Sequence, residues 1–302
     1  MLDNRQRIVS GLILASAGAI AFSGKAIIVK LSYRYGVDAV TVIMLRMLLA
    51  LPFFIVMGFW SERQAHARAN PLHRADWLRI VGLGFVGYYL SSYLDFLGLQ
   101  YITASLERLI LYLNPTLVVV LSWLLYKKPI NAMRMVAMAV SYSGVLLVFA
   151  HELTLAGDNV VLGGALVFAS ALSYAFYLML SGQWVQRIGS IRLVGWATSV
   201  ACVCCIAQFV VLRPLAAALV QPEVWQLAAL NAVACTVAPV LMVMLAIERI
   251  GAGLTAQTGM IGPMATIGMG VIFLGEPLNV WIGVGTALVL GGVFIVSKYG
   301  AK

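Results

Sequence analysis

Ten apolar stretches, each about as long as a membrane-spanning helix, follow one another along the chain with short polar segments between them. A helix needs about 20 mainly apolar residues to cross a bilayer. Hydrophobic residues make up 62% of the chain and charged residues 10%, whereas about a quarter of a soluble domain is charged. The sequence therefore predicts an all-α integral membrane protein with ten transmembrane helices. The expected spans are residues 9–31, 39–60, 77–98, 102–125, 131–150, 160–182, 191–212, 224–247, 253–274 and 278–297.

The distribution of Lys and Arg predicts how these helices are oriented. When the polar segments are assigned alternately to the two sides of the membrane, fourteen basic residues fall on one side and only Lys30, Arg34 and Arg213 on the other. Basic residues favour cytoplasmic loops. We therefore expect both termini in the cytoplasm of a multi-pass protein of the inner (plasma) membrane. This bias also accounts for the net charge of +9, so the expected partner is the lipid bilayer and no nucleic acid.

The stretch 102–148 is repeated without a gap 148 residues later, at 250–296. Chance similarity between apolar segments would not keep prolines and glycines in register. Each copy would hold five helices, an odd number, so the second copy must lie inverted relative to the first, as in many secondary transporters. The expected units are residues 1–150 and 151–302. The matched residues are Pro115 with Pro263, Pro129 with Pro277, Asn131 with Asn279, and Gly144-Val145 with Gly292-Val293.

The segment from Gly98 through Pro115 to Gly144-Val145, echoed from Ala246 through the turn Gly275-Glu276-Pro277 to Gly292-Val293, resembles the EamA-type repeat of the drug/metabolite transporter superfamily. On its length, ten-helix layout and aromatic-rich third span, the chain is most similar to the YddG-type aromatic amino acid exporters. The resemblance implies an export carrier that works by alternating access, with a central cavity lined by both halves. The first copy has Lys127-Lys128-Pro129 at the turn, a difference that we do not expect to bear on transport chemistry.

Tyrosines usually collect at membrane interfaces, but six of them lie deep within the expected spans. A phenol at that depth needs a hydrogen-bond partner or water, and a cavity supplies both. The alternative is that the tyrosines pack the bundle, with their hydroxyls bonded to neighbouring helices. Polar residues at helical spacing complete the expected wall. The candidate cavity residues are Tyr88, Tyr89, Ser92, Tyr93, Tyr112, Asn114, Tyr174, Tyr177, Gln257 and Thr258.

Five charged residues of the first half, Lys25, Arg46, Asp95, Glu107 and Arg108, are expected in one layer near the external end. Charges within a membrane are costly and usually functional. In a structural interpretation Arg46 pairs with Asp95, Arg108 pairs with Glu107, and Lys25 extends outward to the interface. In a functional one the layer is an outer gate, and Glu107 or Asp95 exchanges a proton. The sum of the five charges is positive, which leaves one cation for a substrate carboxylate or a lipid headgroup.

Pro115 and Pro263 each leave the carbonyl one turn earlier, at Leu111 and Gly259, without a helical partner. Each predicts a kink that helps one part of the bundle to rock and offers a hydrogen-bond acceptor; the alternative is a packed kink without such a role. Small residues at helical spacing predict close packing of the fifth and tenth spans, as supporting or dimer-forming helices rather than cavity walls. They are Ala137, Ser141 and Gly144 in the fifth span and Gly283, Ala287 and Gly291 in the tenth.

We find no sequence pattern for an enzyme, a metal site or a cofactor. The four cysteines lie in apolar runs and have no partner in a loop, and no HExxH or GxSxG motif occurs. The leading hypothesis is a secondary exporter of small amphipathic metabolites, most of all aromatic and other hydrophobic amino acids. The alternative is a broad exporter of drugs or lipophilic cations, which requires an accessible acid at the midplane. Either carrier would act as a monomer or a homodimer.

Overall fold

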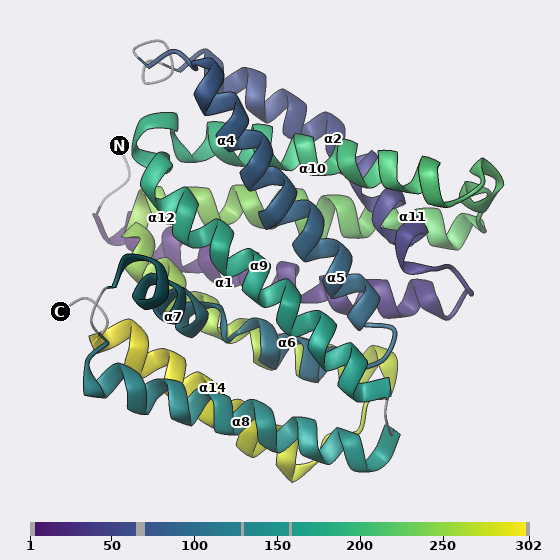
Figure 1. Ribbon diagram of the computed structural model, residues 1–302, viewed down its shortest axis with the longest axis vertical. Helices are drawn as coiled ribbons and strands as arrows, with labels where there is room; N and C mark the ends of the chain where they lie inside the picture. Colours follow the sequence, from purple (N-terminus) through teal and green to yellow (C-terminus); the bar gives the residue numbers. More distant parts are fainter. Residues whose placement is uncertain (1–3, 65–69, 128–129, 157–158, 300–302) are drawn as a thin grey trace.

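A computed structural model describes residues 4–64, 70–127, 130–156 and 159–299 (Figure 1). These residues form helices, and no strand occurs among them. In the labels of Figure 1 the helices are α1 (Asn4–Tyr33), α2 (Ala39–Glu62), α4 (Arg74–Gly84), α5 (Ser91–Gly98), α6 (Ala104–Leu111), α7 (Asn114–Tyr126), α8 (Ala132–Ala156), α9 (Asn159–Ile188), α10 (Ser190–Leu212), α11 (Pro222–Ala232), α12 (Ala238–Thr258), α13 (Gly262–Met269) and α14 (Val280–Tyr299). Short π or 3₁₀ turns are η1 (Phe85–Leu90), η2 (Leu215–Ala218), η3 (Val233–Val237), η4 (Gly259–Ile261) and η5 (Gly270–Leu274).

Eight helices of the described chain are long and apolar enough, by length and composition, to cross a membrane. Each coincides with one of the first eight expected spans to within a few residues. The last two expected spans, 253–274 and 278–297, correspond to the shorter apolar helices Gly259–Leu274 and Val280–Ile295. The prediction of an all-helical membrane fold is confirmed, while the count of ten crossings stays a prediction.

Local signals fix where helices begin and change direction. Asp38 precedes α2, and its carboxylate accepts from the backbone N–H groups of Val40 at 3.0 Å and Thr41 at 3.4 Å. Such a cap satisfies donors that the first helical turn leaves free. Within α12, Gly251 has φ 79° and ψ 160°, a conformation that only glycine adopts readily. The chain therefore turns at Gly251, between the eighth and ninth expected spans.

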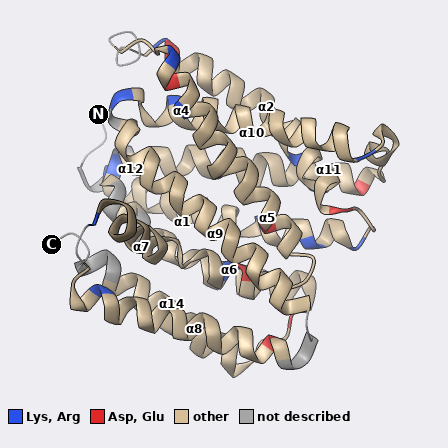
Figure 2. Ribbon diagram, viewed as in Figure 1, with Lys and Arg blue, Asp and Glu red and all other residues tan. Residues whose placement is uncertain are grey.

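The helices pack in reciprocal pairs between the two halves of the chain. Contacts join α1 to α12 and α5 to α9, and further pairs are α2 with α10 and α8 with α14. The eighth expected span, which includes part of α12, packs against α1, the first span. In the same way the third expected span, which includes α5, packs against α9, the sixth span. The start of α1 and the end of α14 lie at the same end of the bundle (Figure 1). We call this the proximal end and the opposite one the distal end. Basic residues gather mainly at the proximal end (Figure 2).

Four spans are interrupted inside the bundle, at equivalent places in the two halves. Residues 112 and 113 separate α6 from α7, and η4 separates α12 from α13, so each proline follows a break and lies in the first turn of the next helix. The π turns η1 and η3 begin at Phe85 and Val233, which differ by the same 148 positions as the sequence repeat. Breaks and π turns often occur at functional sites because they release backbone groups from the helix.

Helices α8 and α14 pack closely against each other through small residues. A side chain added at Gly144 would meet the Gly285 carbonyl oxygen at 2.6 Å, and one added at Gly292 would meet the Ala137 carbonyl oxygen at 2.5 Å. The expected face of the fifth span is therefore the contact face. The expected face of the tenth span is wrong: Gly283 and Ala287 are exposed, and Gly285 and Gly292 make the contact instead. Both faces of this helix carry glycine at helical spacing, so spacing alone did not select between them.

We predict that Gly285→Leu lowers the thermal unfolding midpoint in detergent and that Gly283→Leu does not. A side chain at position 285 meets Val148 and the Gly144 carbonyl, whereas one at position 283 meets nothing within 4 Å. Overpacking of this kind costs about 1–3 kcal/mol. Equal midpoints for the two variants would contradict the close contact between α8 and α14.

Candidate functional site

A central cavity of about 420 Å³ lies among the interrupted helices. This volume falls within the range of about 300–1,000 Å³ typical of small-molecule sites. The described lining comes from both halves of the chain and includes no residue of α8 or α14. These two helices therefore support the cavity without forming its wall. The polar and charged lining residues are Ser23, Lys25, Arg46, Tyr88, Ser91, Ser92, Asp95, Arg108, Tyr112, Asn114, Ser170, Tyr174, Thr198 and Thr236.

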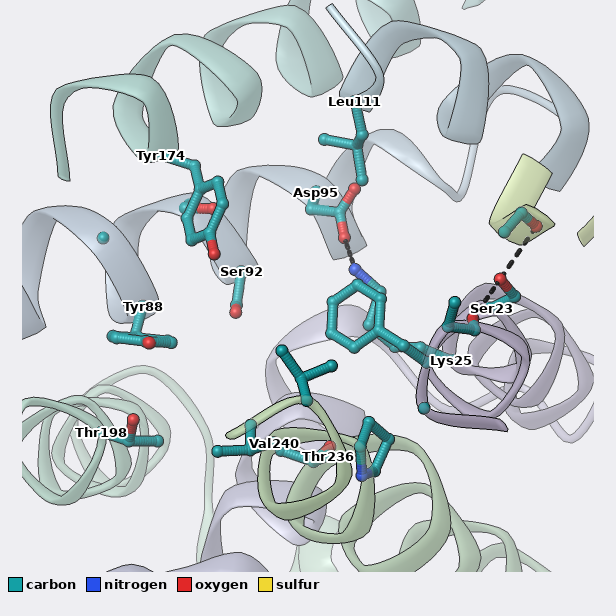
Figure 3. A pocket seen from close by; sticks show the side chains of 18 of the residues that line it. Ser23, Lys25, Tyr88, Ser92, Asp95, Leu111, Tyr174, Thr198, Thr236 and Val240 are labelled. Atoms are coloured by element: carbon teal, nitrogen blue, oxygen red, sulfur yellow. Dashed lines mark hydrogen bonds and ion pairs between the residues drawn. The ribbon is translucent and has the colours of Figure 1, made fainter. Parts of the chain in front are cut away.

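Tyrosines and hydroxyls form one side of the cavity (Figure 3). The Tyr88 and Tyr177 hydroxyls lie 3.1 Å apart, and the Tyr174 and Tyr177 rings stack with centroids 5.5 Å apart. Tyr88 and Tyr174 line the cavity, whereas Tyr177 is buried behind them. Aromatic faces with hydroxyl edges suit a solute that is apolar with some polar character.

A network of buried charges forms another side of the cavity. Lys25 Nζ lies 2.5 Å from Asp95 Oδ2 and 3.6 Å from Glu107 Oε1, and Arg108 Nε lies 3.9 Å from Glu107 Oε2. Figure 3 shows the pair of Lys25 and Asp95 facing the cavity. Glu107 is fully buried and does not line it. Four of the five predicted charges are thus brought together.

The predicted pairing within this layer is wrong in two respects. Lys25 is 7% exposed and bonds to Asp95, so it does not extend outward. Arg46 is 4% exposed, and its guanidinium lies over the Phe96 ring, 4.7 Å from the centroid, and donates to Ser92 Oγ at 3.4 Å rather than pairing with Asp95. Sequence spacing gives the depth of each charge but not which neighbour its side chain reaches.

The two halves also meet at the helix breaks. The Tyr112 hydroxyl donates to the Gly259 carbonyl at 2.6 Å, the group that Pro263 leaves without a helical partner. One turn along, Ser23 Oγ donates to the Gly262 carbonyl at 2.9 Å. Arg108 Nε donates to Thr266 Oγ1 at 3.0 Å. A tyrosine at the break of the first half therefore bonds the break of the second, and all three bonds lie beside the cavity.

Several predicted cavity residues lie elsewhere. Tyr89 and Tyr93 stack on each other with centroids 6.5 Å apart and are not among the lining residues, because helical spacing places them away from the face of Tyr88 and Asp95. Thr258 donates to the carbonyl of Leu254 within its own helix and does not line the cavity. The Gln257 side chain falls outside the described part of the chain. Asn114 lines the cavity, and its Oδ1 has no hydrogen-bond partner there.

Helix α9 supplies two serines that were not predicted from the sequence, of which Ser170 lines the cavity. Ser170 Oγ donates to the Ser91 carbonyl and Ser173 Oγ to the Val86 carbonyl, both at 2.7 Å. These carbonyls belong to η1 and the turn that follows it, where the π geometry disturbs the regular helix bonds. A signal was present, because two serines and two tyrosines recur on α9 at i, i+3, i+4 and i+7, the same spacing that Tyr88, Ser91, Ser92 and Asp95 have in the third span.

Glu276 ties the second half to the first at the distal end. Its carboxylate accepts from the backbone N–H of Ala104 at 2.7 Å and from the Ser105 N–H and hydroxyl at 3.3 and 2.8 Å. A carboxylate is favourable at a helix N-terminus, here that of α6. This contact between the halves was not predicted from the sequence, where only the difference between the two matching turns was considered. Lys128 and Pro129 of the matching turn lie outside the described residues.

Comparison with known proteins identifies the family. A model of the EamA-like transporter family matches residues 9–150 and again residues 161–298. The chain belongs to the EamA-like transporter family. This EamA-like protein is therefore a multi-pass membrane transporter rather than an enzyme. Within its described residues, no group of three His, Cys, Asp or Glu side chains could hold a metal ion.

Relatives of this EamA-like protein carry the same general description. It is 30% identical to the uncharacterized transporter YcbK of Bacillus subtilis (strain 168), over 95% of this chain and 91% of the relative. It is 24% identical to the uncharacterized transporter YyaM of the same strain, over 76% of this chain and 78% of the relative. A solved crystal structure with 14% identity superimposes with a TM-score of 0.65 over 96% of both chains, which shows the same fold.

We predict that Asp95→Asn lowers the thermal unfolding midpoint in detergent far more than Asp38→Asn. The first variant leaves the buried Lys25 with Glu107 alone, and breaking a buried pair costs about 3–5 kcal/mol. Asp38 is the matched control, because its pair with Arg213 is more than a third exposed and is worth at most about 1 kcal/mol. Asparagine also caps α2 as well as aspartate. Similar midpoints would contradict a structural role for the Lys25–Asp95 pair.

Proposed function

We propose that this transporter exports small amphipathic metabolites, chiefly aromatic and other hydrophobic amino acids, across the inner (plasma) membrane by alternating access. The observation that carries the proposal is the central cavity, which joins an aromatic, hydroxyl-bearing side to a charged side and draws its lining from both halves of the chain. The size and polarity suit a small solute with an apolar body and a charged head. The narrower likeness to YddG-type exporters rests on the length of the chain, the expected ten-helix layout and the aromatic-rich third span.

Alternating access is supported by the reciprocal packing of the helices. In this proposal residues 1–150 and 151–302 are two inverted five-helix units, and one set of helices rocks against the other around the cavity. The paired breaks before Pro115 and Pro263 supply the bends that such a motion needs. The proximal end, where basic residues gather, faces the cytoplasm.

Contacts join the two halves at both ends of the bundle, and in our proposal they change during the cycle. The distal contact is the cap of Glu276 on α6, together with Arg34 Nη2, which donates to the Leu274 carbonyl at 2.6 Å. At the proximal end Asp76 pairs with Arg187 at 3.0 Å, and Glu62 pairs with Arg192. In our proposal the distal cap and the charge layer beneath it form the outer gate.

Export of lipophilic cations is the second candidate. Its support is Asp95, an acid that lines the cavity. Lys25, 2.5 Å away, competes with a cationic solute for that carboxylate. Glu107, fully buried and outside the lining, offers a cation nothing in this state. The arrangement of charges therefore favours amphipathic amino acids over lone cations.

We predict saturable counterflow of radiolabelled L-phenylalanine in proteoliposomes that contain the purified protein. Vesicles preloaded with unlabelled phenylalanine should transiently accumulate the label, because a carrier exchanges solute across the membrane whereas a channel only equilibrates it. Empty vesicles and vesicles preloaded with alanine serve as controls. Accumulation of tetraphenylphosphonium without accumulation of phenylalanine would support the second candidate and contradict the first.

We further predict that Glu107→Gln abolishes the dependence of phenylalanine transport on a pH gradient while sparing counterflow at constant pH. Neither Glu107 oxygen has a hydrogen-bond partner, and the charges that face it are Lys25 of α1, Asp95 of α5 and Arg108 of α6. A proton on Glu107 would leave these cations in surplus and loosen the layer. Transport should be measured in vesicles with and without an imposed gradient. A pH dependence equal to that of the unaltered protein would exclude Glu107 as the proton site.

A further inference from the structure

Arg46 differs from the other buried basic residues that the structure describes. Lys25, Arg108 and Arg192 each lie within 4.0 Å of a carboxylate, and no carboxylate of the described residues lies that close to Arg46. Its Nε has no hydrogen-bond partner. The layer of five charges has an excess of one positive charge, and this excess lies at Arg46.

The groups in contact with Arg46 do not neutralise its charge; Asp95, whose charge acts on it, lies more than 4.0 Å away and is paired with Lys25. The Phe96 ring lies beneath the guanidinium, the Met47 sulfur lies 3.9 Å from Nη2, and the thiols of Cys202 and Cys205 lie nearby. These groups are apolar or weakly polar. An unpaired cation in such a place is costly, so its retention points to a partner outside the chain.

Asp95 offers the opposite charge on the same cavity wall. Its Oδ2 accepts from Lys25 at 2.5 Å, and the Glu107 carboxyl group lies beside it; the residue is 2% exposed and lines the cavity. Asp95 and Ser92, the hydroxyl that Arg46 contacts, are one turn apart on the helix that begins at Ser91. The cavity wall therefore holds a cation without an acidic partner, Arg46, and a carboxylate, Asp95, in neighbouring positions.

Resting on the proposed function, we propose that Arg46 and Asp95 form a binding site for a zwitterionic head group. Arg46 binds the carboxylate of an α-amino acid, and the Asp95 carboxylate, which lines the cavity, accepts from its ammonium group. Lys25 and Arg108 are less suited to the carboxylate, because Asp95 and Glu107 already neutralise Lys25, while Arg108 also donates to Thr266 and to the Phe22 carbonyl. The planar guanidinium can hold a carboxylate through two parallel hydrogen bonds.

The geometry assigns the solute side chain to the rest of the cavity. Figure 3 shows Tyr88 and Tyr174 with Thr198 and Val240 around the space beside Ser92 and Asp95. A head group held at Arg46 and Asp95 leaves this aromatic and aliphatic surface for an apolar side chain. The site thus distinguishes hydrophobic amino acids from both lone cations and lone anions.

The test compares Arg46→Met with the unaltered protein in two measurements. Phenylalanine counterflow should fall at least about tenfold, because a buried charge pair with the solute is lost. The thermal unfolding midpoint without ligand should stay the same or rise, since methionine removes an unpaired buried charge. Arg213→Met is the control for loss of an arginine: its pair with Asp38 is partly exposed, and it does not line the cavity. It should leave counterflow unchanged.

Competing solutes test the two charged groups of the head group, the carboxylate and the ammonium, separately. With the unaltered protein, unlabelled phenylalanine should inhibit counterflow more strongly than 3-phenylpropionate, which lacks the ammonium group, and phenethylamine, which lacks the carboxylate, should not inhibit. If Arg46→Met keeps the half-saturation of the unaltered protein, or if its unfolding midpoint falls by several degrees, the site is refuted while the proposed function stands. If the unaltered protein exchanges tetraphenylphosphonium and not phenylalanine, the proposed function and the head-group site are both refuted.

Discussion

The structure depends on the rule that a polar group within a membrane must find its partner inside the protein. Unbroken helices obey this rule by themselves, but this bundle breaks its helices at two prolines and disturbs them at π turns. The other half of the chain then supplies the partner: Tyr112 bonds the Gly259 carbonyl, and Ser170 bonds the Ser91 carbonyl. Because these bonds cross between the halves and border the cavity, the same groups that satisfy the broken backbone also hold the cavity walls in place.

Buried charged groups are subject to the same rule, but they are distributed unequally between the two halves of the chain. Within the described chain the buried cluster of Lys25, Asp95, Glu107 and Arg108 belongs entirely to the first half, and the second half contributes uncharged partners such as Thr266. The N-terminus of α6, which carries two of these charges, is capped by Glu276 from the second half. The backbone frame is therefore close to symmetric, whereas the electrostatics are not. Among the described residues, the charged groups that line the cavity all come from the first half.

Features of the fold that depend on hydropathy and covalent geometry could be predicted from the sequence. Contacts that depend on the direction of a side chain could not. Span positions and the breaks before Pro115 and Pro263 follow from apolar length and from the missing proline donor. The membership of Lys25 and Asp95 in one charged layer follows from the rise per residue. That Lys25 and Asp95 pair with each other does not follow from the sequence, because a lysine side chain can reach several neighbours at one depth in the membrane. For the same reason Tyr89 lies outside the cavity: a tyrosine one position from Tyr88 has equal depth but points about 100° away around the helix.

An uncompensated buried cation also gives the carrier a physical reason to couple loading to motion. A solute can shift a conformational equilibrium only by the difference in its affinity for the two states. While the cavity is empty, Arg46 bears an unpaired charge among Phe96, Met47 and thiols, and any rearrangement that admits water lowers its cost. When a carboxylate occupies the site, that cost disappears and the closed arrangement becomes favourable. In the alternating-access cycle that we propose, closure around a loaded site and opening of an empty one are the two preferences required, and a single arginine without an acidic partner would supply both.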